Sequence, residues 1–211
     1  MKKIIVTIDG PAASGKEKIS NYISNKWKLK HLDSGILYRR LAYFFLTNNI
    51  DFDNLAKTKK ILKKIPKISF RNSKKIRTEE ISRLASKIAI YNFIRVFVNK
   101  LQNDFVNTHI NKQGFVIDGR DIGSVVFKKA DLKLYIDVNP EIRAKRRYKQ
   151  LIDSGEKSIY RKILKELKLR DKKDISRTNS PLVIPKDAHI INNNGSFKYT
   201  INQINELLKN L

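Results

Sequence analysis

Short apolar runs rich in β-branched residues alternate along the chain with segments in which apolar residues recur every fourth position. Residues 3–8 form the first run, and Ile19, Ile23 and Trp27 follow at helical spacing. A short run of this kind predicts a buried strand, whereas a four-residue spacing predicts an amphipathic helix. The chain therefore begins with a strand, a turn that contains Gly10, and a helix.

The same alternation continues to the end of the chain. Three later apolar runs predict strands, at residues 115–117, 132–138 and 189–191. Asn139 and Pro140 follow the second of these runs as the N-cap and first residue of a helix, and another helix is expected from about Lys198. Strands separated by helices form parallel sheets covered on both faces, so we expect a three-layer α/β/α domain with a central parallel sheet.

Residues 51–80 break this pattern, because they are rich in lysine and contain one weak candidate strand, residues 67–70, in which Ile68 and Phe70 alternate with polar residues. The whole segment is expected to be a small insert that lies outside the main sheet.

The composition suits one folded globular domain, since 41% of the 211 residues are hydrophobic and 31% are charged. The chain has no cysteine, which excludes disulfides, thiolate zinc sites and a cysteine nucleophile. Its longest apolar run, residues 41–46, is far too short to cross a membrane, and the N-terminal run is too short for a signal peptide. We expect a cytoplasmic protein.

A net charge of +25 would ordinarily suggest a nucleic-acid partner. Lysine, isoleucine and asparagine are all abundant, however, and all three have A/T-rich codons, so a biased genome explains the charge as well. Charge alone therefore identifies no function. The few glycines, arginines and aspartates are more informative than the many lysines.

A phosphate-binding loop (P-loop) is predicted immediately after the first strand. The sequence Gly10-Pro11-Ala12-Ala13-Ser14-Gly15-Lys16 matches G-x-x-x-x-G-K between a strand and a helix, the context that this motif requires. Glycines allow successive N–H groups to point inward, the helix N-terminus adds positive potential, and the lysine adds a charge for the outer phosphates. The alternative is a glycine-rich turn with an exposed lysine.

The residue after the P-loop lysine is ordinarily Ser or Thr, whose hydroxyl helps to hold magnesium. Here it is Glu17, and Lys18 follows. A carboxylate beside phosphates repels them unless it ligates the metal, whereas Lys18 could partly replace the missing hydroxyl by contacting phosphate. Three interpretations stay open: the metal is held differently, activity is weakened, or activity is lost. Our hypothesis is an impaired but active enzyme.

Several further motifs, taken in order and spacing with the P-loop, resemble those of bacterial cytidylate kinases over nearly the whole chain. They are Ile8-Asp9-Gly10-Pro11, Asp33-Ser34-Gly35 with Tyr38-Arg39, Ile76-Arg77-Thr78-Glu79-Glu80, Asp118-Gly119-Arg120-Asp121-Ile122-Gly123, and Leu169-Arg170-Asp171 with Pro181-Leu182. That family has glycine and threonine where this chain has Glu17 and Lys18. The resemblance implies transfer of a phosphoryl group from ATP, with Mg²⁺, to CMP or dCMP.

The resemblance also implies which residues form the site. ATP would lie against the P-loop and the two residues after it: Gly10, Pro11, Ala12, Ala13, Ser14, Gly15, Lys16, Glu17 and Lys18. The acceptor would be bound by Ser34, Arg39, Ser86, Arg95, Arg120, Asp121, Arg170, Asp174 and Arg177. The catalytic residues would be Lys16, Arg120, Arg170 and Arg177. Asp118 ends an apolar strand, where acidic residues of P-loop folds commonly lie near magnesium. It would hold Mg²⁺ through a water molecule, or else cap the following turn.

One predicted segment of the site has a second interpretation. Arg170, Lys173, Asp174 and Arg177 recur at i, i+3, i+4 and i+7, which places them on one helical face if the helix persists. Such a face is usually a solvated stripe of ion pairs, but the resemblance implies a mobile lid in residues 148–178. It also implies a single kinase domain over residues 1–211, with a reduced acceptor-binding insert at residues 50–85.

For other charged residues the sequence gives a less specific indication of their role. Arg143, Arg146 and Arg147 follow the helix start at Pro140 and are further candidates to flank ATP. His31, His109 and His189 lack the spacing of metal ligands, so we expect surface or structural roles for them.

Two alternatives to a CMP kinase remain at this point. One is a related P-loop kinase that acts on another small-molecule acceptor. The other is a catalytically degenerate, basic protein that binds nucleotides or RNA. For the kinase interpretation we expect ATP and CMP or dCMP as small-molecule partners, no obligatory nucleic acid, no membrane, and a monomer.

Overall fold

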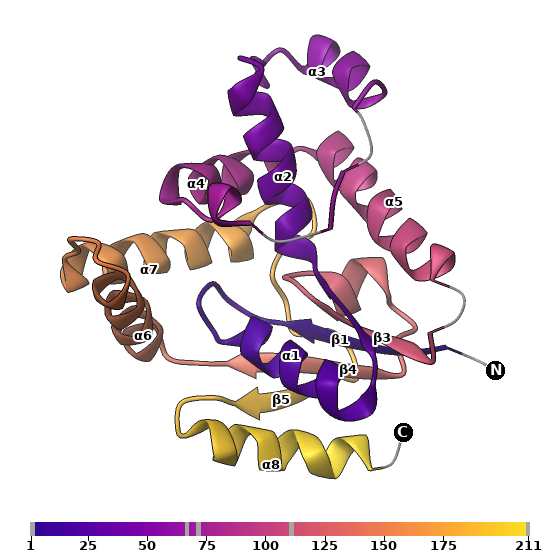
Figure 1. The fold of residues 1–211 in the computed structure, drawn as a ribbon, viewed down its shortest axis with the longest axis vertical. Helices are drawn as coiled ribbons and strands as arrows, with labels where there is room; N and C mark the ends of the chain where they lie inside the picture. The colour runs from indigo at the N-terminus through magenta and orange to yellow at the C-terminus, as the bar shows by residue number, and fades with distance from the viewer. Residues whose placement is uncertain (1–2, 66–67, 71–72, 110–111, 210–211) are drawn as a thin grey trace. The chain divides into compact units, whose positions relative to one another are not determined.

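The computed structural model describes residues 3–65, 68–70, 73–109 and 112–209 (Figure 1). The chain divides into two compact units. The first comprises residues 1–31 and 112–211, and the second comprises residues 32–111.

A five-stranded sheet with the strand order β2-β3-β1-β4-β5 forms the centre of the fold. The strands are β1 (Ile4–Asp9), β2 (Lys30–Asp33), β3 (Gly114–Asp118), β4 (Leu132–Asp137) and β5 (His189–Asn192). Strand β1 pairs in parallel with β3 and β4, and β4 pairs in parallel with β5. The predicted strands at residues 3–8, 115–117, 132–138 and 189–191 are confirmed, as is the α/β class with a central parallel sheet.

Helices α1 (Lys16–Trp27) and α8 (Phe197–Leu208) cover one face of this sheet. Alternate residues of β4, beginning with Leu132, are buried in a cluster that also contains Ile19 and Ile23 of α1 and Ile204 of α8. The two-residue period of the strand and the four-residue period of the helix each produce an apolar face, and these two faces pack together. Both helices were predicted, α1 from its four-residue period and α8 as a C-terminal helix from about Lys198.

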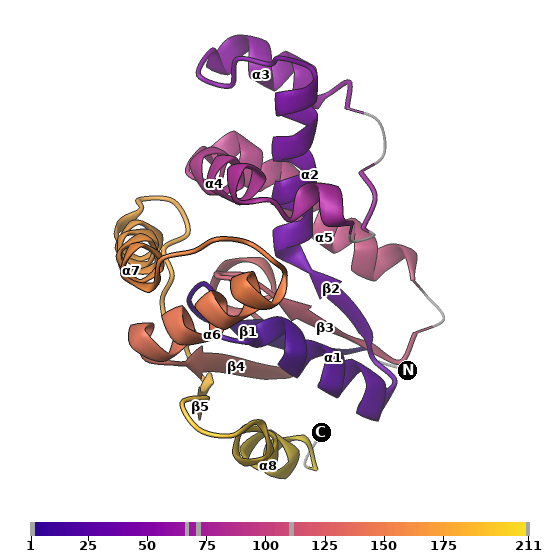
Figure 2. The same cartoon turned by 60° about the vertical axis from the view of Figure 1, so that its left-hand side comes forward.

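Helices α6 (Pro140–Asp153) and α7 (Tyr160–Ser176) lie side by side in the same unit (Figure 2). Their contact is a small apolar cluster that includes Ala144, Leu151 and Leu167, together with Ala12 of the P-loop. Pro140 is the first residue of α6, as predicted, but the side chain of Asn139 makes no capping hydrogen bond. The backbone N–H of Asn139 instead donates to Oδ1 of Asn194, at 2.8 Å.

The regular structure of the second unit is helical over its described residues, apart from the end of β2 at residues 32–33. It contains α2 (Ser34–Thr47), α3 (Leu55–Leu62), a 3₁₀ turn η1 (Lys74–Ile76), α4 (Glu79–Ile88) and α5 (Asn92–Thr108). Its core gathers residues such as Leu37, Leu41 and Phe45 of α2 with Ile88 and Ile94. Thr78 caps α4 by accepting a hydrogen bond from the Ile81 N–H at 3.2 Å.

The predicted strand at residues 67–70 is wrong over residues 68–70, which have no regular secondary structure; residue 67 lies outside the described residues. Ile68 and Phe70 instead supply side chains to the helical core, where the ring centroid of Phe70 lies 4.9 Å from that of Phe105. The described part of residues 51–80 contributes no strand to the sheet, in line with the expected insert. Across the described residues, no helix combines the length and apolarity needed to cross a membrane.

Candidate active site

The segments that carry the predicted chemistry follow the carboxyl ends of parallel strands. Asp118 at the end of β3 is level with Ile8 of β1, and Asp137 at the end of β4 is level with Asn192 of β5. Parallel strands present their carboxyl ends at one edge of a sheet, where α/β proteins bind ligands. The P-loop, residues 119–123 and the turn after β5 are therefore neighbours despite their separation in sequence.

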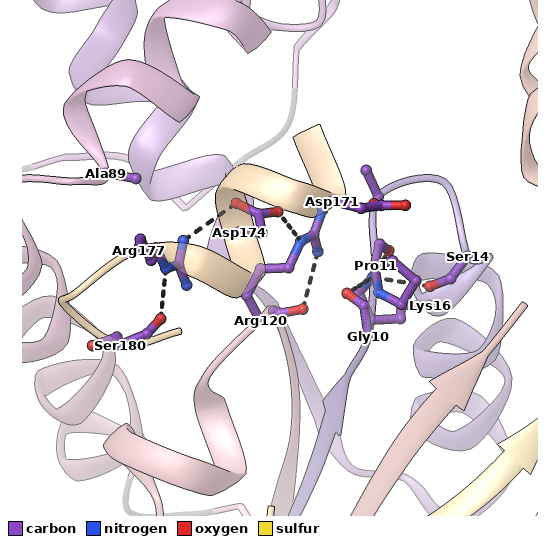
Figure 3. Close-up of polar contacts among 12 residues, drawn as sticks. Gly10, Pro11, Ser14, Lys16, Ala89, Arg120, Asp171, Asp174, Arg177 and Ser180 are labelled. Carbon is purple, nitrogen blue, oxygen red and sulfur yellow. Dashed lines mark hydrogen bonds and ion pairs between the residues drawn. The ribbon is translucent and has the colours of Figure 1, made fainter. Parts of the chain in front are cut away.

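The P-loop folds around the ammonium group of Lys16. Gly10 and Gly15 have φ values of 148° and 85°, and a Cβ on Gly10 would lie 2.6 Å from the Ile136 carbonyl oxygen. Lys16 is only 6% exposed, and its Nζ donates to the Gly10 carbonyl at 2.9 Å and to the Pro11 carbonyl at 2.7 Å (Figure 3). Nζ also lies 3.0 Å from the Ser14 hydroxyl. The loop thus holds a buried cation at the N-terminus of α1.

Burial, followed by the positive charge of Arg120, holds the pKa of Lys16 well below its usual range. The carboxylates of Asp118 and Asp9 act in the opposite direction, and Arg170 adds to the lowering. A phosphate in the loop would add negative charge beside the buried Lys16 and the half-buried Arg120 and Arg170. The electrostatics therefore favour an anionic ligand.

Glu17 and Lys18, the two unusual residues after Lys16, are both exposed in the first turn of α1. The Nζ of Lys18 lies 4.1 Å from the ring centroid of Phe197, at the start of α8. This distance is typical of a cation–π contact. In this conformation the Lys18 ammonium contacts α8, and its predicted contact with phosphate stays a prediction.

Asp118, the predicted magnesium residue, has a histidine partner. Nε2 of His31 lies 2.5 Å from Oδ1 of Asp118, and Nδ1 of His31 lies 3.0 Å from Oδ1 of Asn21. The described residues contain no group of three or more acidic or histidine side chains arranged to hold a metal. Mg²⁺ bound with a nucleotide usually takes one or two carboxylates, phosphates and several waters, so one buried carboxylate fits a water-mediated contact.

Asp9, at the end of β1, was not singled out as a site residue in the sequence. Its buried carboxylate accepts hydrogen bonds from the backbone N–H groups of Ile122 at 2.9 Å and Gly123 at 2.7 Å. These bonds fix the segment that directly follows Arg120 and Asp121. Burial raises the pKa of Asp9 to about 6, and the negative charge of Asp121 contributes to the rise.

The raised pKa of Asp9 predicts a pH-dependent contribution to stability. Between the ordinary pKa of 3.8 and about 6, the folded protein retains a proton that the unfolded chain has released. Stability from this group is therefore fully present below that window and is lost as pH rises through it. Relative to an Asp9→Asn variant, we expect the free energy of unfolding of the wild type to fall by about 3 kcal/mol across the window.

Urea unfolding of both proteins at several pH values measures this difference. The asparagine cannot titrate, so any loss of a backbone hydrogen bond in the variant adds only a constant offset. A difference between the two proteins that does not change with pH would contradict the assignment.

Three predicted residues meet in one network. Nε of Arg120 donates to Oδ2 of Asp174 at 3.2 Å, and Nη1 of Arg177 donates to Oδ1 of the same carboxylate at 3.4 Å (Figure 3). Nε of Arg177 also donates to the Ser180 carbonyl at 2.6 Å. The expected four-residue helical face is wrong in one respect, because α7 ends at Ser176 and Arg177 has an extended backbone. Arg177 reaches Asp174 from the segment after the helix.

The structure also gives the positions of the other predicted site residues in the first unit. Asp121 is buried beside the segment held by Asp9, whereas Arg170 is half-buried on α7 and close enough to Lys16 to lower its pKa. Lys173, on the same helix, is exposed.

Arg143 is buried and contacts three segments. Its Nε donates to the Val138 carbonyl at 3.0 Å, its Nη1 to the Ala12 carbonyl at 3.0 Å, and its two Nη atoms to the carboxylate of Asp171 at 3.1 and 2.5 Å. Arg146 donates to the carbonyl groups of Asn193 and Gly195, at 2.9 and 3.3 Å. The predicted direct contact of these arginines with ATP stays a prediction.

Four predicted acceptor residues lie in the second unit. Ser34 is buried at the start of α2, and Nη2 of Arg39 donates to Oδ2 of Asp33 at 2.7 Å. Arg95 is 2% exposed, with its Nη1 donating to the Ala89 carbonyl at 3.0 Å and its guanidinium 5.8 Å from the Tyr38 ring centroid. Ser86 is half-buried on α4. The structure thus divides the predicted acceptor residues between the units.

The parallel sheet with a P-loop at the carboxyl end of β1 defines a P-loop α/β protein. Among solved structures, this fold is similar to TT1252 from Thermus thermophilus, with a TM-score of 0.57, 16% identity, and 100% of this chain and 99% of that chain covered. It is also similar to a shikimate kinase from Bacteroides thetaiotaomicron, with a TM-score of 0.52, 9% identity and 98% of each chain covered. These likenesses support the fold.

Sequence comparison identifies the family. The cytidylate kinase family model matches residues 6–210. A cytidylate kinase from Bartonella tribocorum is 38% identical over 191 residues, 90% of this chain and 87% of its own length. One from Rickettsia africae is 37% identical over 206 residues, 97% of this chain and 91% of its own length. This chain therefore belongs to the cytidylate kinase family.

Proposed function

We propose that this chain transfers the γ-phosphoryl group of ATP to CMP, and to dCMP, giving ADP and CDP or dCDP. The observation that carries the proposal is its membership of the cytidylate kinase family over residues 6–210. The buried Lys16 ammonium inside the P-loop supports it, because an isolated buried cation is costly unless an anion joins it.

The donor side of the proposal places the triphosphate of ATP along residues 10–18. Backbone N–H groups of the loop and the Lys16 ammonium would bind the outer phosphates. Asp118 would hold a water of Mg²⁺, and the metal, when bound, would neutralise charge on the phosphates. Glu17 is exposed at the start of the same helix, so its carboxylate could also approach the metal.

On the acceptor side, arginines bind the phosphate of CMP. Arg39, Arg95 and Arg120 have the planar guanidinium geometry that suits a phosphate. Ser34 and Ser86 would offer hydroxyl groups to the nucleoside, and Asp121 would accept from the amino group of cytosine or from the sugar. Cytosine carries an amino donor where uracil has a carbonyl acceptor, so an acid at this position favours cytosine.

The proposed mechanism is positioning rather than covalent catalysis. Phosphoryl transfer requires the attacking and leaving oxygens in line and positive charge around the moving group. Lys16, Arg120, Arg170 and Arg177 would supply that charge. Asp174 would keep two of these arginines in place, and closure of residues 148–178 would exclude water and limit hydrolysis of ATP.

A panel of acceptors tests the proposal. The purified protein is incubated with ATP and Mg²⁺ together with CMP, dCMP, UMP, AMP or shikimate, and both ADP and the phosphorylated product are measured. We expect CDP and dCDP as the main products. Greater turnover of another acceptor would overturn the substrate assignment, and RNA binding without any ADP formation would overturn the assignment as an enzyme.

The residues after Lys16 give a further prediction. Replacing Glu17 by Gly and Lys18 by Thr removes a negative charge near the phosphates and restores a hydroxyl. We expect magnesium-dependent ATP binding to strengthen by roughly fivefold to tenfold, the effect of one ordinary hydrogen bond worth about 1–1.5 kcal/mol. Calorimetry with and without Mg²⁺ measures the change. Unchanged or weaker binding in the double variant would mean that Glu17 and Lys18 do not impair this loop.

We also propose that the enzyme is a cytoplasmic monomer. The lack of cysteine supports a protein that needs no disulfide. Light scattering coupled to size-exclusion chromatography tests the oligomeric state, and a dimer mass would reject this part of the proposal.

A further inference from the structure

We propose that Asn193 and Arg143 are positioning residues for ATP: they bind P-loop carbonyl groups from outside and thereby direct the next N–H groups toward the phosphates. This inference rests on the proposed binding of ATP at the P-loop. Neither residue needs to touch the nucleotide to act in this way.

Asn193 binds the loop through its side-chain amide. Its Nδ2 donates to the Ser14 carbonyl at 2.8 Å, and its Oδ1 accepts from the hydroxyl of Thr200 at 2.8 Å. Its own backbone is also held, since its N–H donates to the Asp137 carbonyl at 3.0 Å and its carbonyl accepts from Arg146. Asn193 is 5% exposed, and both polar atoms of its buried side-chain amide are hydrogen-bonded.

The Asn193 amide binds a backbone carbonyl, and this carbonyl sets the direction of the N–H group in the same peptide unit. Peptide units are planar, and in a trans unit the C=O and N–H point in opposite directions. No cis peptide bond occurs among the described residues. The unit that carries the Ser14 carbonyl also carries the Gly15 N–H. A carbonyl held outward by Asn193 therefore directs the Gly15 N–H away from Asn193, into the loop.

The space around Gly15 supports the same role. A Cβ on Gly15 would lie 2.9 Å from Nδ2 of Asn193, so the amide packs directly against this glycine. The φ of 85° at Gly15 is a conformation that other residues rarely adopt. The Asn193 amide therefore packs against a glycine that is itself in a left-handed conformation.

Arg143 acts on the loop in the same way, two peptide units nearer its start. Its Nη1 donates to the Ala12 carbonyl, and the unit that carries this carbonyl also carries the Ala13 N–H. Arg143 is 2% exposed and is itself fixed by the carboxylate of Asp171 on α7. Asp171 follows Arg170 directly in sequence. The Arg143–Asp171 ion pair therefore connects the P-loop to the helix that carries this predicted catalytic arginine.

The test compares Asn193→Asp with Asn194→Asp. Aspartate has the size of asparagine and can still accept from Thr200, but it cannot donate to Ser14. Asn194 is the next residue of the same turn and is half-buried. It binds the Asn139 N–H and Asn192 rather than the P-loop, so its variant matches the added charge. ADP binding by calorimetry, KM values for ATP and CMP, and melting temperature are measured for both.

We expect Asn193→Asp to weaken ADP binding by roughly tenfold to a hundredfold and to raise KM for ATP, with KM for CMP unchanged. Asn194→Asp is expected to stay within about twofold of the wild type in all of these. Equal losses in the two variants would assign the effect to charge and overturn the proposal, as would unaltered ADP binding in Asn193→Asp.

Two further variants keep the outcome decisive. If Asn193→Asp does not fold, Asn193→Ala removes the donor without adding charge, and the same criteria apply to it. Arg143→Lys keeps the charge but cannot donate to three segments at once, and it should also weaken ADP binding. The inference would be refuted, but the proposed function left intact, if the wild type phosphorylates CMP and all these variants bind ADP as well as the wild type does. No CMP phosphorylation by the wild type would instead refute the proposed function.

Discussion

Replacing Lys16 by alanine is expected to lower kcat/KM for CMP phosphorylation by at least about a hundredfold, or about 3 kcal/mol of transition-state stabilisation. The Lys16 ammonium is buried among three P-loop oxygens, where its charge is poorly screened by water. Its position at the N-terminus of α1 places it where the β- and γ-phosphates would gather negative charge.

Steady-state kinetics of Lys16→Ala beside Lys26→Ala measure this effect. Lys26 is exposed in the last turn of the same helix, so its variant removes one of the many surface charges without altering the loop. Only the first variant is expected to lose activity. Turnover of CMP by Lys16→Ala at the rate of the wild type would show that the chemistry lies elsewhere.

The second large effect is expected at Asp174. Its carboxylate is 7% exposed and accepts from both Arg120 and Arg177. Asparagine keeps the shape but removes the negative charge, which leaves two guanidinium groups close together without their shared counterion. The two arginines then lose the positions from which they would stabilise the moving phosphoryl group, so kcat/KM for CMP should fall by roughly a hundredfold in Asp174→Asn.

The control for this variant is Asp187→Asn, the same substitution in an exposed turn. Asp187 has a positive φ of 63°, which asparagine tolerates well. Melting temperatures of both variants separate a loss of fold from a loss of activity. A folded Asp174→Asn protein with normal kinetics would remove this network from the mechanism.

The helices and strands that could be predicted are those whose own sequence pattern shows which side chains are buried. The strands at residues 132–138 and 189–191 are bounded by turn residues, and the period of Ile19 and Ile23 matches the sheet face that they cover. The predicted strand at residues 67–70 was wrong over its described part. Apolar residues can pack in a helical core as well as in a strand, and in so short a segment the sequence period cannot distinguish these two cases.

The predicted site residues are those within contiguous motifs, such as the P-loop around Lys16. The partners that support them come from distant segments: Asp9 holds the N–H groups of residues 122 and 123, His31 contacts Asp118, and Asn193 binds Ser14. These contacts depend on the strand order of the sheet, which no local pattern contains. In the sequence, Asn193 is the middle residue of Asn192-Asn193-Asn194, and nothing distinguishes it from its neighbours.

The most direct test of the account follows the phosphoryl group itself. ATP labelled at its γ-phosphate is mixed with the protein, Mg²⁺ and CMP, and the products are separated by chromatography. We predict that the label appears in CDP, that its appearance requires CMP, and that Lys16→Ala suppresses it. Release of the label as inorganic phosphate at the same rate with and without CMP, with none in CDP, would contradict the account.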